Sequence, residues 1–266
     1  MTATTTATPV RSTLVLADGR RLSWLDFGGP GRPLLALHGH LAEGADFTGT
    51  AALLAPEWRV IAPDQRGHGD SDRGADYSRE GYLDDAVALL HHLDLGPLPV
   101  LGHSGGAVTA YQLAARHPGL VSALIDEEGA AELPEGPSPL SFVLSFPYTA
   151  PTREELLAAL GPIAPMVGDR LRPLPDGSWR LPFHPEDTVR SEGLVHGDHW
   201  ADWLGSSCPA LLVSGNRMPC LPTDLATAMT ERRPHTELVT LDADHFVHAA
   251  APAAFTDAVR AFLARI

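Results

Sequence analysis

The stretch that decides the fold is residues 98–117, which read Leu-Pro-Val-Leu-Gly-His-Ser-Gly-Gly-Ala-Val-Thr-Ala-Tyr-Gln-Leu-Ala-Ala-Arg-His. A short apolar run, typical of a buried strand, is followed by small residues and then by apolar residues at helical spacing. A serine at such a junction occupies a turn so sharp that its neighbours must be small, here Gly102 and Gly106. Its hydroxyl then projects from the edge of the sheet. We therefore take Ser104 as the candidate nucleophile, in preference to the alternative of an ordinary glycine-rich loop.

The same alternation of apolar runs and helical patterns extends along the chain. Strands are predicted at 34–38, 59–63, 100–102, 123–126, 210–214 and 238–241. Helices are predicted at 46–54, 79–93, 107–116, 222–232 and 252–266. Strands buried on both faces and joined by helices predict an α/β fold with a doubly wound, mostly parallel sheet. Residues 13–15 and 22–27, around Asp18-Gly19, predict an antiparallel hairpin at its edge.

The composition of the chain limits the kinds of molecule that it can be expected to bind. The 266 residues carry a formal net charge of −14, which argues against nucleic acid or an anionic membrane as a partner. The sequence contains no lysine, which excludes lysine Schiff-base chemistry and a Walker-type phosphate loop. No apolar run reaches the roughly 20 residues of a membrane span, and the start of the chain lacks a signal-peptide pattern. We expect a cytoplasmic monomer or homodimer that acts on a small molecule, with Cys208 and Cys220 as free thiols.

Between residues 129 and 207 the alternation fails, and we interpret this stretch as a helical lid inserted over the sheet. It has a helical piece at 153–160, a turn at Asp176-Gly177 and an aromatic cluster that includes Trp200 and Trp203. Ligands of open α/β sheets bind at the carboxyl ends of the strands, which a lid would cover. The two tryptophans therefore either line a substrate pocket or pack the lid onto the body.

A serine hydroxyl needs a base to accept its proton, and the base needs an orienting acid. The best candidate base is His245, because it falls in the loop between the last predicted strand and the last helix. His248 is its nearest rival but lies closer to the helix. The pair His196 and His199 is the only hint of a metal site, and no coherent ligand set accompanies it, so we expect no metal and no cofactor.

Four motifs together resemble the α/β-hydrolase superfamily. They are His-Gly-His at 38–40, Asp-Gln-Arg-Gly-His-Gly-Asp-Ser at 64–71, the serine turn at Ser104, and Asp-His-Phe at 244–246. The resemblance implies a core of residues 11–128 and 208–266, a lid at 129–207 and a disordered tail at 1–10. It also implies an oxyanion hole made by the backbone N–H groups of His40 and Gly105. The glycines of residues 66–69 are better explained by a structural turn than by a site.

The position of the acid that would orient His245 departs from the usual pattern of this superfamily. Most members carry an aspartate three residues past a glycine in the loop after the penultimate strand, where this chain has Met218. Glu128 lies 24 residues beyond Ser104, a spacing similar to that in zearalenone-type lactonases and some haloalkane dehalogenases, which take their acid from this strand. Asp126 is the second choice, because side chains two apart on a strand share a direction. Glu127 is then expected to face solvent, and Asp224 is an outside candidate explained as well by a helix N-terminus.

These observations predict a serine hydrolase that cleaves an ester or lactone of an apolar small molecule through Ser104, His245 and Glu128. His103, Trp200, Trp203 and Phe246 are the candidate substrate-binding residues. One alternative is a cofactor-free dioxygenase, a class that also resembles this chain and uses the histidine as a base toward substrate. The other is a binding protein without catalysis, which the intact serine and histidine disfavour.

Overall fold

The centre of the protein is an eight-stranded sheet with the strand order β1-β2-β4-β3-β5-β6-β12-β13. The computed structural model describes residues 8–218 and 220–266. The strands are β1 (Val10–Val15), β2 (Arg21–Asp26), β3 (Arg32–Leu37), β4 (Trp58–Pro63), β5 (Leu98–His103), β6 (Val121–Glu127), β12 (Ala210–Gly215) and β13 (Thr236–Leu241). All neighbouring pairs are parallel except the two that involve β2. The predicted α/β fold, its strands and the antiparallel edge are thereby confirmed.

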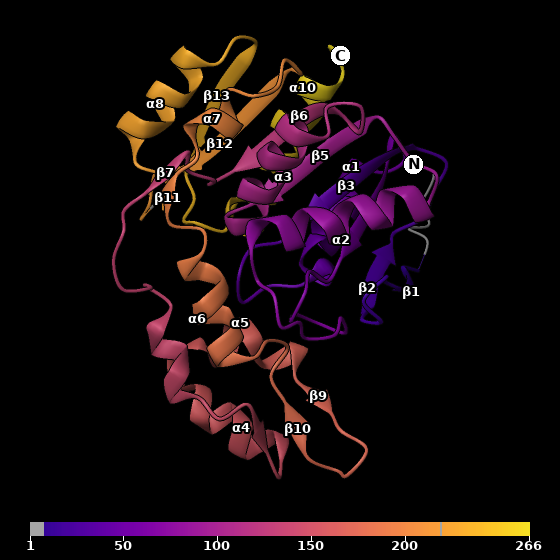
Figure 1. Cartoon of the computed structure of the whole chain (residues 1–266), viewed down its shortest axis with the longest axis vertical. Helices are drawn as coiled ribbons and strands as arrows, with labels where there is room; N and C mark the ends of the chain where they lie inside the picture. Colours follow the sequence, from indigo (N-terminus) through magenta and orange to yellow (C-terminus); the bar gives the residue numbers. More distant parts are fainter. Residues whose placement is uncertain (1–7, 219) are drawn as a thin grey trace.

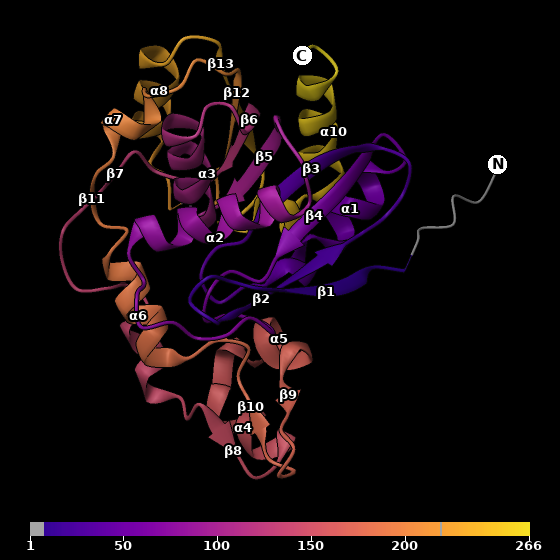
Figure 2. The ribbon, with the colours of Figure 1, turned by 45° about the vertical axis from the view of Figure 1, so that its right-hand side comes forward.

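Helices cover both faces of the sheet (Figures 1 and 2). One apolar cluster joins the sheet to α2 (Arg79–His92), α3 (Gly105–Arg116) and α8 (Thr223–Arg232). A second cluster joins the opposite face to α1 (Thr48–Leu54), which follows the short helix η1 (Gly44–Phe47), and to α10 (Pro252–Leu263). Strands β5, β6 and β12 are therefore almost completely buried, which explains their continuous apolar runs.

The stretch of residues 129–207 is for the most part a separate lobe in Figure 1, but its last helix, at 200–203, lies against α3 of the main body. The helix predicted at 153–160 is present in this stretch, whereas its small sheet was not predicted from the sequence patterns. Its helices are η2 (Ser141–Ser145), α4 (Arg153–Leu160), η3 (Gly161–Ile163), α5 (Ala164–Val167), η4 (Gly168–Arg170), α6 (Pro185–Gly193) and α7 (Trp200–Trp203). Its strands are β8 (Thr149–Ala150), β9 (Arg172–Pro173) and β10 (Trp179–Arg180), which form a three-stranded sheet, and β7 (Glu132–Leu133) with β11 (Gly197–Asp198). The Asp176-Gly177 turn joins β9 to β10.

The lobe lies over the loops that follow β3 and β4. Phe183 bridges to His68, and the backbone N–H of Gly69 donates to the Pro182 carbonyl at 2.7 Å. Leu41, from the loop after β3, joins the small apolar core of the lobe. These contacts place the lobe at the carboxyl edge of the sheet, where a lid was predicted.

Several boundaries differ from the predictions by a few residues. The predicted tail at 1–10 ends too late, because Val10 already pairs with Asp26 in the first hairpin, while residues 1–7 lie outside the described residues. The last helix ends at Leu263 and not at Ile266. None of the described helices has the length and apolar character that a membrane crossing requires.

Candidate active site

Ser104 stands at the junction of β5 and α3 with φ 55° and ψ −123°, a backbone conformation that side chains rarely adopt. The turn is held from both sides: the Ser104 N–H donates to the Glu127 carbonyl at 2.8 Å, and the Ala107 N–H donates to the Ser104 carbonyl at 2.8 Å. The serine itself is only half-buried. The strained turn therefore presents the hydroxyl at the sheet edge, as the flanking glycines predicted.

Gly106 shows why the turn needs small residues. A Cβ atom at this position would lie 2.2 Å from the Leu37 carbonyl oxygen and 2.5 Å from that of His38. We expect Gly106→Ala to lower the free energy of unfolding by about 3 kcal/mol, because rigid backbone has to move. Urea denaturation measures this loss.

The matched control for that variant is Gly49→Ala. Gly49 lies in α1 with open space around it, so alanine there is expected to leave stability unchanged or raise it by about 0.5 kcal/mol. Equal stability of the two variants would contradict the steric explanation of the turn.

The two predicted oxyanion donors lie next to each other. A Cβ atom at Gly105 would approach the His40 ring to 3.0 Å, so glycine leaves room for this contact. Within the described residues, neither the Gly105 nor the His40 backbone N–H donates to a protein acceptor. The His40 ring itself lies 3.0 Å from the Ser191 hydroxyl on α6, and burial lowers the pKa of His40 to about 3, which keeps the ring neutral.

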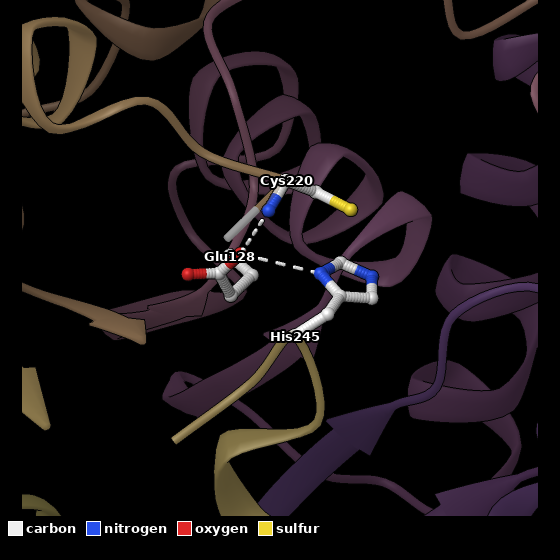
Figure 3. A group of neighbouring side chains, drawn as sticks. All are labelled: Glu128, Cys220 and His245. Carbon is white, nitrogen blue, oxygen red and sulfur yellow. Dashed lines mark hydrogen bonds and ion pairs between the residues drawn. The ribbon is translucent and has the colours of Figure 1, made fainter. Parts of the chain in front are cut away.

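Glu128 and His245 form the core of the site (Figure 3). His245 Nδ1 lies 3.2 Å from Glu128 Oε2, and the carboxylate is fully buried. Since a carboxylate only accepts, Nδ1 carries a hydrogen, so in the neutral ring Nε2 has the lone pair that a base needs. Figure 3 shows the imidazole with its other nitrogen turned away from Glu128.

Three backbone N–H groups fix the same carboxylate. Gly215 donates to Oε1 at 2.7 Å, and Cys220 and Leu221 donate to Oε2 at 2.7 and 3.2 Å. Glu128 follows β6 with φ 60°, a left-handed backbone that lets its side chain reach the loop after β12. The glutamate thus reaches the loop after β12, where the resemblance described above leads one to expect an aspartate.

Comparison with known protein families identifies the family to which this fold belongs. Residues 32–252 match the family model described as alpha/beta hydrolase fold. The chain belongs to this family.

Among its relatives, this alpha/beta hydrolase is 29% identical over 244 residues to the magnesium-chelatase 30 kDa subunit of Rhodobacter capsulatus, with 85% of each chain covered. Its fold is similar to that of E-2-(acetamidomethylene)succinate hydrolase, with a TM-score of 0.85, 22% identity, and 96% and 99% of the two chains covered. It is also similar to a marine microorganism esterase, with a TM-score of 0.81, 26% identity, and 91% and 98% coverage.

The hydrolase buries all three consecutive acids at the end of β6, and each has its own partner. Asp126 accepts the Gly129 N–H at 2.7 Å, and burial raises the pKa of Asp126 well above its ordinary value. Glu127 holds His248, with Nδ1 at 2.8 Å from Oε1. The expectation that Glu127 faces solvent is wrong, because this carboxylate has no exposed surface and is paired with a histidine. Of these three acids, only Glu128 forms a hydrogen bond with His245.

His248, the rival base, lies among buried rings. Its ring lies 5.2 Å from the Phe47 ring, and only 6% of the residue is exposed. Burial alone would lower the pKa of His248, but the Glu127 carboxylate outweighs burial and raises it. His248, in the short helix α9 (Val247–Ala250), therefore ties the segment before α10 to Glu127, while His245 keeps a partly exposed ring.

His103 and Phe246 pack against the base. The His103 ring lies 4.8 Å from the His245 ring and 4.9 Å from the Phe246 ring, and His103 Nε2 donates to the His245 carbonyl at 3.0 Å. His103 is 1% exposed, so the structure gives it a positioning role and not the predicted substrate contact. Phe246 is half-buried next to His245 and stays a candidate for substrate contact.

The structure places both lid tryptophans away from the nucleophile. Trp203 is fully buried, donates its indole N–H to the Met229 carbonyl, and packs on Tyr111. Tyr111 is seven residues past Ser104 on α3, about 10 Å along the helix. Trp200 is stacked under the Arg232 guanidinium at 3.6 Å. Packing, the other alternative from the sequence, is the role that these contacts give the two tryptophans.

Cys220 is the site residue that the sequence did not indicate. Its Sγ lies within 4.8 Å of the ligand atoms of Glu128 and His245, although in the sequence it is only an isolated free thiol. Burial alone would lower the pKa of His245, but Cys220 and Glu128 outweigh burial and raise it to about 10. The pKa of His245 therefore depends on two neighbouring side chains, Cys220 and Glu128, of which only Glu128 was predicted.

This arrangement predicts a pH effect for Cys220→Ala. Loss of the thiol removes one of the two groups that favour the imidazolium, so the pKa of His245 falls. Because the base acts when neutral, we expect the acidic limb of kcat/KM to move to lower pH by roughly one unit in metal-free buffer. The profile of Cys208→Ala is expected to match the wild type. A limb that moves to higher pH in Cys220→Ala would contradict the assignment of His245 as the base.

Proposed function

We propose that this alpha/beta hydrolase cleaves a carboxylic ester or lactone of a small molecule through an acyl-enzyme. Ser104 Oγ attacks the carbonyl carbon while His245 Nε2 accepts the hydroxyl proton. The backbone N–H groups of His40 and Gly105 stabilise the negative oxygen of the tetrahedral intermediate. His245 then protonates the leaving oxygen, and a water molecule, activated by the same nitrogen, releases the acid and restores Ser104.

The observation that carries this proposal is the pairing of Glu128 with His245 Nδ1 beside a strained serine turn. The pairing selects the tautomer with a free lone pair at Nε2. In the described residues no hydrogen bond joins the Ser104 hydroxyl to His245, which is common before substrate binds. The neighbouring N–H groups of His40 and Gly105, both without protein acceptors, supply the second element that acyl transfer needs.

The class of substrate rests on two further points. Relatives are named as an esterase and as a succinate-derivative hydrolase, which supports hydrolysis of a carboxylic acid derivative. The position of the acid at the end of β6 supports the lactonase hypothesis, by its resemblance to zearalenone-type enzymes.

A fluorophosphonate probe tests the proposal directly. We expect the probe to modify Ser104 and no other serine, as located by mass spectrometry of peptides, and a panel of esters and lactones to be hydrolysed by the same preparation. Heating the protein beforehand is the control, because only the folded site activates the hydroxyl. Labelling confined to other residues, with no hydrolysis in the panel, would overturn the proposal.

A further inference from the structure

Glu128, Cys220 and His245 bring three different metal-ligating groups to one place at the mouth of the site. The carboxylate oxygen, the thiol sulfur and the imidazole nitrogen all lie within 4.8 Å of one another. Figure 3 shows the thiol beside the imidazole ring, opposite the carboxylate. Glu128 is buried, His245 is half-buried and Cys220 is exposed, so the cluster is open to solvent on the cysteine side.

The separations fit a tetrahedral ion. Two ligands about 2.0 to 2.1 Å from a tetrahedral zinc ion stand about 3.3 Å apart. His245 Nδ1 and Glu128 Oε2 stand 3.2 Å apart, which is close to that separation. An ion bound to both atoms lies beside the line that joins them, so the imidazole has to turn to aim its Nδ1 lone pair at the ion. The Cys220 sulfur is exposed and lies within 4.8 Å of both atoms, so metal binding requires this side chain to move closer, and water completes the fourth position.

We propose that Glu128, Cys220 and His245 form a site for a thiophilic divalent cation, Zn²⁺ being the best fit, and that the bound cation switches off the base. Sulfur, imidazole and carboxylate are the ligands that zinc takes in proteins. The inhibitory part of this inference rests on the proposed function, whereas the binding part stands on the ligands alone.

The inhibition follows from the two nitrogens of one imidazole. A neutral imidazole has one lone pair and one hydrogen, and in the free enzyme the hydrogen is on Nδ1. When the cation takes the Nδ1 lone pair, the hydrogen moves to Nε2, which no longer accepts the Ser104 proton.

Zinc retention by the whole chain tests the binding part. We expect wild-type protein treated with Zn²⁺ and then gel-filtered to keep about one ion per chain by elemental analysis. Cys220→Ser is expected to need roughly tenfold or more Zn²⁺ for the same occupancy. The matched control is Cys208→Ser, which removes the other free thiol and is expected to behave as wild type. Co²⁺ in place of Zn²⁺ should give a sulfur-to-metal charge-transfer band that only Cys220→Ser loses.

Inhibition is measured on the same variants, each relative to its own metal-free rate. Wild type and Cys208→Ser should lose ester hydrolysis at the Zn²⁺ concentration that fills the site, and a chelator should restore it. Equal zinc retention by Cys220→Ser and wild type would overturn the site. Retention that depends on Cys220 while hydrolysis continues would instead refute His245 as the base, and thereby the proposed function.

Discussion

Ser104→Ala is expected to lower kcat for ester or lactone hydrolysis by roughly 10⁴ to 10⁶-fold while the protein stays folded. The hydroxyl is the only group of the turn that forms the acyl-enzyme in the proposed mechanism. Alanine keeps the Cβ and leaves in place the backbone hydrogen bonds to Glu127 and Ala107 that hold the strained turn. The loss is therefore chemical, and KM should change far less than kcat.

The measurement is steady-state hydrolysis of the best ester in the panel, with oxygen consumption followed in parallel. Ser141→Ala, at an exposed serine in the lid, is the control and should keep the wild-type rate. Oxygen uptake that survives Ser104→Ala would show a cofactor-free dioxygenase. A ligand recovered unchanged from wild-type protein, without probe labelling, would show a binding protein.

Glu128→Gln is the second large effect, with an expected loss in kcat of roughly 10³ to 10⁴-fold. The carboxylate accepts from three backbone N–H groups and from His245 Nδ1. The glutamine amide has only one acceptor oxygen. Its NH₂ group would face backbone N–H donors, with which it cannot form a hydrogen bond. The imidazole loses the partner that fixes its tautomer, so Nε2 no longer holds the lone pair in most molecules.

Asp126→Asn is the matched control for the acid. The same kind of change is made two residues earlier on the same segment. Among the described residues Asp126 accepts only the Gly129 N–H, and it makes no hydrogen bond to His245. We expect its kcat to stay within about tenfold of wild type. A large loss in Asp126→Asn with little loss in Glu128→Gln would make Asp126 the acid. Circular dichroism of both variants separates a loss of fold from a loss of chemistry.

The fold was predictable because its local signals agree with one another. Each buried parallel strand is a continuous apolar run, and glycines mark the one turn where a side chain would meet the Leu37 carbonyl. The small sheet of the lobe was not predicted, because strands of two residues carry no periodicity.

The site residues that could be predicted are those whose place is determined by the strand that they follow. Ser104, His245 and Glu128 follow the ends of strands, and parallel strands bring their carboxyl ends to one edge. Other contacts depend on side-chain packing that one sequence does not reveal. Glu127 was expected in solvent because it alternates with Asp126 and Glu128 along the strand, and the sequence left Trp203 open between pocket lining and packing because aromatic clusters occur in both settings. Cys220 lies at the site with its backbone N–H bound to Glu128, a contact between residues 92 positions apart that spacing in the sequence does not reveal.

The way in which Glu128 holds the loop after β12 has a consequence for how this enzyme can diverge. The Glu128 carboxylate accepts hydrogen bonds from the main-chain N–H groups of residues 215, 220 and 221. Every amino acid except proline supplies such a group. Side chains along this loop can therefore be exchanged without loss of the anchor, whereas an inserted or deleted residue shifts the donors out of reach. In the proposed mechanism the acid follows β6, so this loop supplies no member of the triad. Apart from Cys220, its composition can then vary at fixed length.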